Sequence, residues 1–399
     1  MTSRVRGRMR KGRFLGTRGR VAVGVGVVAL VAAAAAGWVA DGHQILPEHA
    51  TLTSTRPIGK LARLAPPAPP PPAELQATIA KLAETYREPV GIAVTDVSDR
   101  WTAQVAGSEV FPQQSVSKLW VALTVFQAVD RHAMTLDQPV VLTPDDRSVF
   151  YQPLASRIRG PNGYATTVYD LLRRQLTESD NAANDKLIRE VGGGGAVDRT
   201  LAEKGLAGLG VGETERDLQT RAAGLTWRPE YGQTWIFKQA REQLPDAVRD
   251  AAISQYLANP PDGAKPMAIT ESLAALKRGE LLSPGSTEAM LGLMGEAKTG
   301  LSRLRAGLPA GWSIAHKTGT GPDWRGASVG INDVGLVTAP DGRSFAVAVM
   351  MRETRKSVPA RLVLFQRISR AIVDYWRETP ATPPDQRMAS AGGGALLTR

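Results

Sequence analysis

A serine and a lysine stand three positions apart in Ser115-Val116-Ser117-Lys118, where strand-like sequence gives way to a helical pattern over 119–129. If the helix begins here, the two side chains share one face, and the amine can serve the hydroxyl as base or proton relay. A serine at a helix start also lies near free backbone N–H groups, which stabilise an oxyanion. The pair therefore suits nucleophilic acyl transfer, although a helix cap beside a surface lysine explains the same residues.

A second polar motif, Ser179-Asp180-Asn181, lies between two helical patterns that run over 168–176 and 183–190. A short loop between helices can project a hydroxyl and an amide into a shared cleft. Ser, Asp and Asn also favour the first position of a helix, so capping is the alternative interpretation.

A third motif, Lys317-Thr318-Gly319-Thr320-Gly321, ends the strand-like segment 313–316 and precedes another strand over 332–337. A lysine and a hydroxyl beside glycines suit a carboxylate ligand, because glycine lets the ligand approach the backbone closely. A plain glycine turn explains the residues as well. Arg325, Arg352 and Arg355 are further candidates for a carboxylate, and solvated surface positions are their alternative.

The body that must position these motifs is expected over 74–378. Strand patterns at 90–97, 101–105, 329–338 and 345–351 flank a mostly helical region from 118 to 298, and an amphipathic helix stands at each end. This order predicts an α+β fold, in which an antiparallel sheet built from both chain ends is flanked by N- and C-terminal helices and carries an inserted helical subdomain.

The ends of the chain differ from this body. Eight of the eleven net positive charges fall in residues 1–20, and residues 21–40 are uncharged and apolar. This order predicts a basic cytoplasmic segment before a cleaved signal peptide or a retained membrane anchor, and hence an exported protein. Residues 41–73 are predicted to form a proline-rich linker, and residues 379–399 a disordered tail. The body lacks the basic and aromatic pattern of nucleic-acid binding. The chain has no cysteine, which excludes disulfides and a thiol nucleophile.

The three motifs in this order resemble the penicillin-recognising serine enzymes, and most of all the class A β-lactamases. Five shorter sequences extend the resemblance over roughly 74–376: Phe111-Pro112, Tyr151-Gln152-Pro153, Gly192-Gly193, Arg278-Gly279-Glu280-Leu281-Leu282 and Leu308-Pro309-Ala310-Gly311-Trp312. The resemblance implies the β-lactamase and transpeptidase type of fold.

The resemblance also implies a role for each motif residue. Catalysis would fall to Ser115 as nucleophile, Lys118 as its activator and Ser179 as proton relay to the leaving nitrogen. Among the substrate-binding residues, Asn181 would bind the amide, and Lys317, Thr318 and Gly319 would bind the carboxylate. The backbone N–H groups of Ser115 and Thr320 would bind the oxyanion. Tyr151 would form an aromatic wall.

Hydrolysis of an acyl-enzyme needs a base, which class A enzymes carry as the glutamate of an E-x-x-L-N pattern. Here Glu215-Arg216-Asp217-Leu218-Gln219 resembles that pattern, with Gln219 in place of asparagine. Glutamine retains an amide that can hold a water jointly with Glu215. Arg216 replaces a proline that usually follows a cis bond; a cis bond costs about 2.5–4 kcal/mol without proline, so the loop must be held otherwise. Glu213, Glu230 or no effective base are the alternatives.

The segment 220–266 is longer than the corresponding family loop by roughly thirty residues, enough for a lid or a partner contact. Its aromatic residues, Trp227, Tyr231, Trp235, Phe237 and Tyr256, favour a small satellite core instead.

Together these features predict a monomeric serine β-lactamase whose substrate is a small β-lactam or a peptidoglycan-like peptide. No cofactor is expected, and no metal, because the four histidines lack metal-ligand spacing. No nucleic acid is expected as partner, and contact with a membrane is expected through the N-terminal segment alone. The rival predictions are a penicillin-binding D-alanyl-D-alanine carboxypeptidase or transpeptidase, and a tethered binding protein without turnover.

Overall fold

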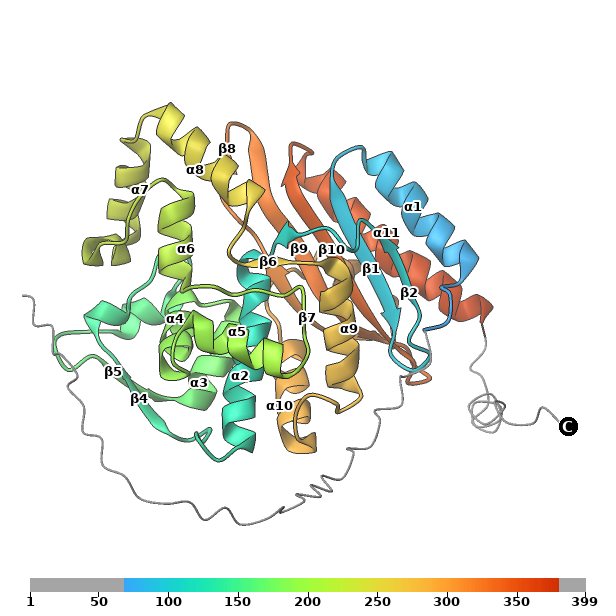
Figure 1. Cartoon of the computed structure of the whole chain (residues 1–399), viewed down its shortest axis with the longest axis horizontal. Coiled ribbons are helices and arrows are strands. Elements are labelled where there is room, and N and C mark those ends of the chain that lie inside the picture. Colours follow the sequence, from blue (N-terminus) through green and yellow to red (C-terminus); the bar gives the residue numbers. More distant parts are fainter. Residues whose placement is uncertain (1–67, 380–399) are drawn as a thin grey trace, which may run out of the picture. The chain divides into compact units, whose positions relative to one another are not determined.

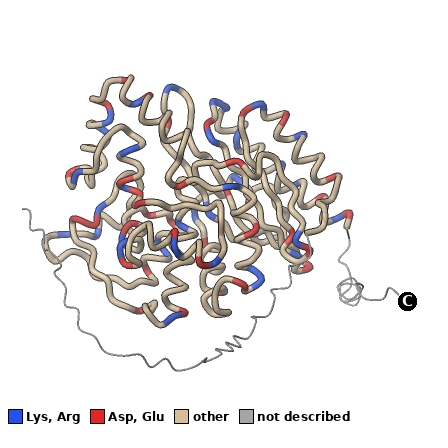
Figure 2. Tube along the Cα trace, viewed as in Figure 1, with Lys and Arg blue, Asp and Glu red and all other residues tan. Residues whose placement is uncertain are grey.

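The computed structural model describes residues 68–379 (Figure 1). The predicted segments 1–20 and 21–40, most of the linker and nearly all of the tail therefore lie outside the described residues. The first described helix begins at Ala73 and the last ends at Glu378. No helix between residues 68 and 379 combines the length and apolar character needed to span a membrane. Basic and acidic residues are interspersed along the described chain (Figure 2).

The sheet is antiparallel and follows the order β2-β1-β10-β9-β7, with β8 paired to β9. It combines strands from both ends of the described chain, as predicted. Its strands are β1 (Val90–Asp96), β2 (Thr102–Val105), β7 (Ser313–Gly319), β8 (Asp323–Trp324), β9 (Ala327–Thr338) and β10 (Ser344–Thr354). Gly342, with φ of 88°, supplies the left-handed residue of the turn between β9 and β10.

The central strands alternate between two cores, because successive side chains of a strand point to opposite faces. From β10, Phe345, Val347 and Val349 pack with helices α1 (Ala73–Tyr86) and α11 (Val358–Glu378). Ala346, Ala348 and Met350 instead join the larger core of the helical subdomain. Helix α9 (Pro266–Lys277) packs on β1 and β10.

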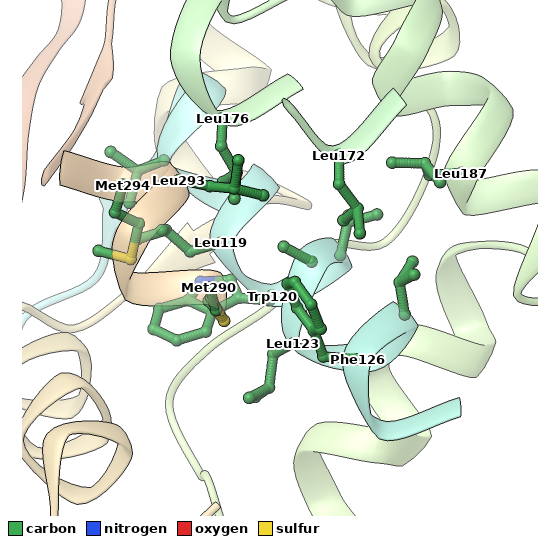
Figure 3. Close-up of a cluster of buried hydrophobic side chains, with 14 of the residues drawn as sticks. Leu119, Trp120, Leu123, Phe126, Leu172, Leu176, Leu187, Met290, Leu293 and Met294 are labelled. Carbon is green, nitrogen blue, oxygen red and sulfur yellow. The ribbon is translucent and has the colours of Figure 1, made fainter. Parts of the chain in front are cut away.

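Helix α2 (Lys118–Asp130) forms the centre of the helical subdomain. Its first ten residues are all buried, as expected for a helix that is apolar on every side. Leu119, Trp120 and Leu123 contribute to a cluster completed by side chains from α3 and the turn after it, from α4 and from α10 (Figure 3). The subdomain also contains α3 (Val168–Arg173), α4 (Asn181–Glu190), α5 (Gly194–Glu203), α6 (Glu215–Ala222) and α10 (Pro284–Gly295). Of these helices, α4, α5 and α10 pack directly on α2, and α6 packs on α4.

Several boundaries differ from the sequence prediction. The helix expected over 168–176 changes at Arg174 into a π-helical turn that ends at Glu178, and the next helix begins at Asn181 rather than at residue 183. Two short strand pairs were also not predicted: β3 (Phe111–Pro112) with β6 (Gly263–Ala264), and β4 (Pro139–Leu142) with β5 (Tyr164–Thr167). Strands of two to four residues are too short to show a period in the sequence.

The long segment 220–266 contains α7 (Thr234–Glu242) and α8 (Asp246–Ala258). Tyr231 and Phe237 form a small cluster with Val149, and Trp227 packs on it. Tyr256 belongs to a second cluster, with Leu218 of α6. Trp235 is 65% exposed, so four of the five aromatic residues enter satellite clusters and one does not.

Candidate active site

Ser115 lies in a 3-10 turn (Gln114–Ser117) that leads into α2. The preceding residue, Gln114, has a φ of 52°, a left-handed conformation that a non-glycine residue keeps only when its surroundings hold it. Those surroundings are polar: the Gln114 N–H donates to Asp262 Oδ2 at 2.6 Å, and its side-chain amide donates to Tyr256 Oη at 2.6 Å. The turn that presents Ser115 is thus fixed by residues of the long segment and its end.

The side chain of Lys118 lies within 3.5 Å of the three other predicted catalytic residues, Ser115, Ser179 and Glu215. Lys118 is fully buried, so the alternative interpretation, a surface lysine beside a helix cap, is wrong. Its Nζ lies 2.8 Å from Ser115 Oγ, 2.6 Å from Asn181 Oδ1 and 3.1 Å from Glu215 Oε1. A buried cation requires such partners, because desolvation without them is expensive.

Ser179 stands between two lysines. Its φ of 64° turns the chain between the π-helical turn and α4. Its hydroxyl oxygen lies 2.9 Å from Lys317 Nζ and 3.5 Å from Lys118 Nζ. The capping interpretation holds for Asp180, which accepts a hydrogen bond from Ala183 N at 3.0 Å. The hydroxyl of Ser179 is left for the cleft.

Lys317, Thr318 and Gly319 form the end of β7, the edge strand next to the Ser115 turn. Burial, and then the charge of Lys118, lower the pKa of Lys317 well below its usual value. A side chain at Gly319 would collide with the carbonyl oxygen of Gln113, so only glycine allows β7 to lie this close to the turn.

Glu215 is the first residue of α6 and is 3% exposed. Gln219 Nε2 lies 3.3 Å from Glu215 Oε2 and donates to Gln114 Oε1 at 2.8 Å. Glu213 pairs with Arg221, and Glu230 pairs with Arg228 at 2.7 Å. Of the three carboxylates considered from the sequence, Glu215 is the one that lines the cleft.

The loop that carries Glu215 is held by Asp185 of α4. Its carboxylate accepts from the backbone N–H of Glu215 at 2.6 Å, from that of Arg216 at 3.1 Å and from Ser148 Oγ at 2.6 Å. No peptide bond between residues 68 and 379 is cis, so Arg216 follows a trans bond. Burial raises the pKa of Asp185 to about 6. This carboxylate was not identified from the sequence, where an aspartate within a polar helix resembles a surface residue.

Most of these residues meet in a cleft of about 380 Å³. The predicted site residues that line it are Ser115, Tyr151, Ser179, Asn181, Glu215, Gln219, Thr318 and Thr320. Lys118 and Lys317 lie behind this surface and reach it through the hydroxyls of Ser115 and Ser179. Tyr151 is 58% exposed at the rim.

Arg303 also lines the cleft and was missed, because its surroundings in the sequence carry no motif. Its Nη2 donates to Thr320 Oγ1 at 2.7 Å. The three arginines considered instead have other partners: Arg325 Nε pairs with Asp250 at 2.9 Å, Arg352 Nη2 with Glu109 at 3.7 Å, and Arg355 Nη1 donates to the backbone of Arg325 at 2.7 Å. None of them lines the cleft.

Comparison with known proteins agrees with this geometry. Residues 74–376 match the beta-lactamase enzyme family. Beta-lactamase VEB-1 of Pseudomonas aeruginosa is 25% identical over 288 residues, which cover 72% of this chain and 85% of VEB-1. A β-lactamase crystal structure from Chitinophaga pinensis has a TM-score of 0.62 at 27% identity and covers 75% of this chain and 98% of its own.

An ancestral class A β-lactamase is similar as well, with a TM-score of 0.59 at 27% identity, covering 76% of this chain and 100% of the ancestral chain. The family match spans nearly the whole body that carries the sheet, the helical subdomain and the cleft. This chain therefore belongs to the β-lactamase enzyme family, and its similarity is to class A members.

Proposed function

We propose that the protein is a serine β-lactamase that forms an acyl-enzyme on Ser115 and hydrolyses it with water activated by Glu215. In the first step Ser115 Oγ attacks the β-lactam carbonyl carbon. Lys118, whose Nζ lies 2.8 Å away, takes part in this step as a neutral amine and accepts the serine proton. The carbonyl carbon–nitrogen bond then breaks. Ser179, which is oriented by Lys317 Nζ at 2.9 Å, delivers its proton to the leaving nitrogen and takes a proton back from Lys118 Nζ, 3.5 Å away, so that the amine is neutral again.

Substrate binding is proposed for the polar groups around the nucleophile. Lys317 and Thr318, with Gly319 between them and Thr320, would hold the substrate carboxylate, and Asn181 its amide. The backbone N–H groups of Ser115 and Thr320 would stabilise the oxyanion, where fixed donors act most strongly. Tyr151 would cover one side of the bound ligand.

The observation that carries the proposal is a buried carboxylate in the same cleft as the nucleophile. Oε1 of Glu215 pairs with Lys118 Nζ at 3.1 Å, and its Oε2 accepts from Gln219 Nε2 at 3.3 Å. A carboxylate oxygen has two lone pairs, so Glu215 can still accept a proton from a water near the acyl-enzyme. Gln219, tied to Gln114 at 2.8 Å, offers the amide that would help to position this water.

A mass and turnover experiment tests this function. The full chain in a nonionic detergent is mixed with a chromogenic cephalosporin, while hydrolysis is followed by absorbance and adducts by intact mass. We expect fast turnover with no lasting adduct. A long-lived adduct on Ser115 would favour the penicillin-binding peptidase, and the lack of both hydrolysis and any adduct would favour a binding protein without turnover.

We further propose that the enzyme acts outside the cytoplasm, in the periplasm or beyond. This rests on the basic residues 1–20 followed by the apolar residues 21–40. The chain is produced in bacteria and its N-terminus is determined in the soluble exported fraction and in the membrane fraction. A mature start near residue 40 indicates cleavage, an intact N-terminus in the membrane indicates an anchor, and activity confined to the cytoplasm contradicts export.

A further inference from the structure

A second cavity of about 440 Å³ adjoins the catalytic cleft. Arg303, Thr320 and Gly321 line both the catalytic cleft and the second cavity. The second cavity continues towards α11, where Leu362 and Phe365 line it. Its size falls within the range of about 300–1,000 Å³ that is usual for small-molecule sites. The proposed hydrolysis makes no use of this space beyond Thr320.

Two guanidinium groups face this cavity, those of Arg303 and Arg361. Arg303 donates to the carbonyl of Gly319 at 2.9 Å and to Thr320 Oγ1 at 2.7 Å. Arg361 donates to the carbonyl of Lys356 at 2.6 Å and to Ser328 Oγ at 2.8 Å. These neutral acceptors hold both groups in place. Within residues 68–379, the acceptors of both guanidinium groups are carbonyl and hydroxyl oxygens, and Nη2 of Arg361 donates none of these hydrogen bonds.

The charge around the cavity favours an anion. Burial lowers the pKa of Arg303; the buried carboxylate of Asp333 opposes this shift, and the nearby charge of Arg361 adds to it. The cavity is lined by one acid, Asp323, whose carboxylate is exposed and accepts a hydrogen bond from Ser328 Oγ. Among the residues that line the cavity, two cations face one anion. Arg361 retains free donors, because a guanidinium carries five N–H bonds.

We propose that this cavity binds an anionic substituent of the substrate that extends past Thr320 from the carboxylate end of the β-lactam. The inference rests on the proposed function, because Lys317 and Thr318 are what would place the substrate carboxylate beside Thr320. In a cephalosporin, the ring carbon next to the one that bears the carboxylate carries the C3 substituent. An acidic C3 substituent is thus the part of the substrate nearest to Arg361.

Two cephalosporins form a matched pair for the test. Cefamandole and cefonicid share the same acylamino side chain and the same C3 tetrazolylthiomethyl group; cefamandole carries a methyl group on the tetrazole, and cefonicid a sulfomethyl group. In the full chain, Arg361→Ala should raise KM for cefonicid about tenfold, the effect of losing one charge-assisted hydrogen bond. The KM for cefamandole should change by less than about twofold.

Two further variants keep the test specific. Arg370→Ala removes the same charge from the exposed side of α11 and should leave the ratio of the two KM values unchanged. Asp323→Asn removes the opposing carboxylate and should lower KM for cefonicid. The inference is overturned if Arg361→Ala affects both compounds equally or neither, or if Arg370→Ala has the same effect as Arg361→Ala.

A binding measurement separates this inference from the proposed function. In the full chain carrying Ser115→Ala, which cannot be acylated, calorimetry gives the dissociation constant of each compound with and without Arg361→Ala. If the wild-type chain hydrolyses neither compound but cefonicid still binds about tenfold more tightly when Arg361 is present, the proposed hydrolysis fails and the anion site stands. If hydrolysis is fast but binding of the two compounds responds equally, the anion site fails alone.

Discussion

Lys118 and Lys317 lie on elements that are positioned by the apolar core, whereas Glu215 lies at the start of α6, where the buried carboxylate of Asp185 holds the backbone. Lys118 begins α2, whose first ten residues are buried, and Lys317 lies in the ladder between β7 and β9. The loop of Glu215 instead depends on Asp185, and the nearby Gln114 depends on Asp262 and Tyr256. Apolar packing responds little to pH, while hydrogen bonds to buried carboxylates respond strongly. The two sides of the cleft should therefore fail under different perturbations.

Removing core volume beneath Lys118 should cause the largest loss of stability. Trp120 is 2% exposed, so Trp120→Ala should lower the free energy of unfolding by about 3–5 kcal/mol. Urea denaturation measures the change, with Trp235→Ala as the control because Trp235 is 65% exposed. A comparable loss in both variants would mean that the core does not hold this side of the cleft.

Loss of Asp185 should affect deacylation more than acylation. Asp185→Ala leaves the backbone N–H groups of Glu215 and Arg216 without their acceptor, so the loop and its carboxylate should shift. A displacement of about 1 Å can cost about a hundredfold in rate. Stopped-flow kinetics with a chromogenic cephalosporin resolves the two steps. Equal loss in both steps would show that Asp185 supports the whole cleft rather than the loop alone.

The buried carboxylates should also make stability depend on pH. Burial raises the pKa of Asp262 to about 7 and that of Asp185 to about 6 in the folded protein. An unfolded aspartate has a pKa of about 3.9, so the folded state binds the extra protons between about pH 4 and pH 7. Their contribution to stability is full below about pH 4 and is lost as pH rises through the folded pKa values.

Denaturation at a series of pH values measures how the free energy of unfolding changes with pH. Asp262→Asn, which cannot ionise, should reduce the loss of unfolding free energy between pH 4 and pH 7 by on the order of 4 kcal/mol, because the folded pKa of Asp262, about 7, lies about three units above the unfolded value. Tyr256 and Glu215 are the charged or titratable groups that act most directly on Asp262, so Tyr256→Phe is the informative second variant. An unchanged slope in Asp262→Asn would contradict the role given to this carboxylate.

The smallest expected effect concerns the hydrogen bond at Tyr256. Tyr256→Phe leaves the Gln114 side-chain amide without its acceptor at 2.6 Å. Unfolding should become easier by about 1–3 kcal/mol, the cost of an unsatisfied buried polar group. The same denaturation assay measures it. Stability equal to that of the wild type would show that the Gln114 turn does not need this contact.

The same contrast separates what the sequence predicts from what it does not. Ser115, Ser179 and Lys317 could be identified because each lies in a short motif that combines hydroxyl, amine or amide side chains. The strands and helices around these motifs also show a clear period of apolar residues. Their meeting in one cleft followed from resemblance, since spacing alone does not bring positions this far apart together. Asp185 and Asp262 could not be identified, because burial of an aspartate depends on tertiary partners that no local pattern reports.

Arg303 and the long segment illustrate a second limit. Arg303 lies among polar and glycine residues that predict a loop, and its contacts with Gly319 and Thr320 come from a distant strand. The aromatic residues of 220–266 predicted a satellite core, yet Tyr256 also bonds to the turn before Ser115. A polar contact of this kind has no signature in composition or periodicity.

The lifetime of the acyl-enzyme in Glu215→Ala tests the central claim most directly. Intact mass is followed after mixing with the chromogenic cephalosporin, and Glu213→Ala serves as a matched control because Glu213 lies outside the cleft and pairs with Arg221. We predict a stable adduct on Ser115 in Glu215→Ala and turnover without a lasting adduct in Glu213→Ala. An adduct in Glu215→Ala that disappears as fast as in the wild type would contradict the assignment of Glu215 as the base.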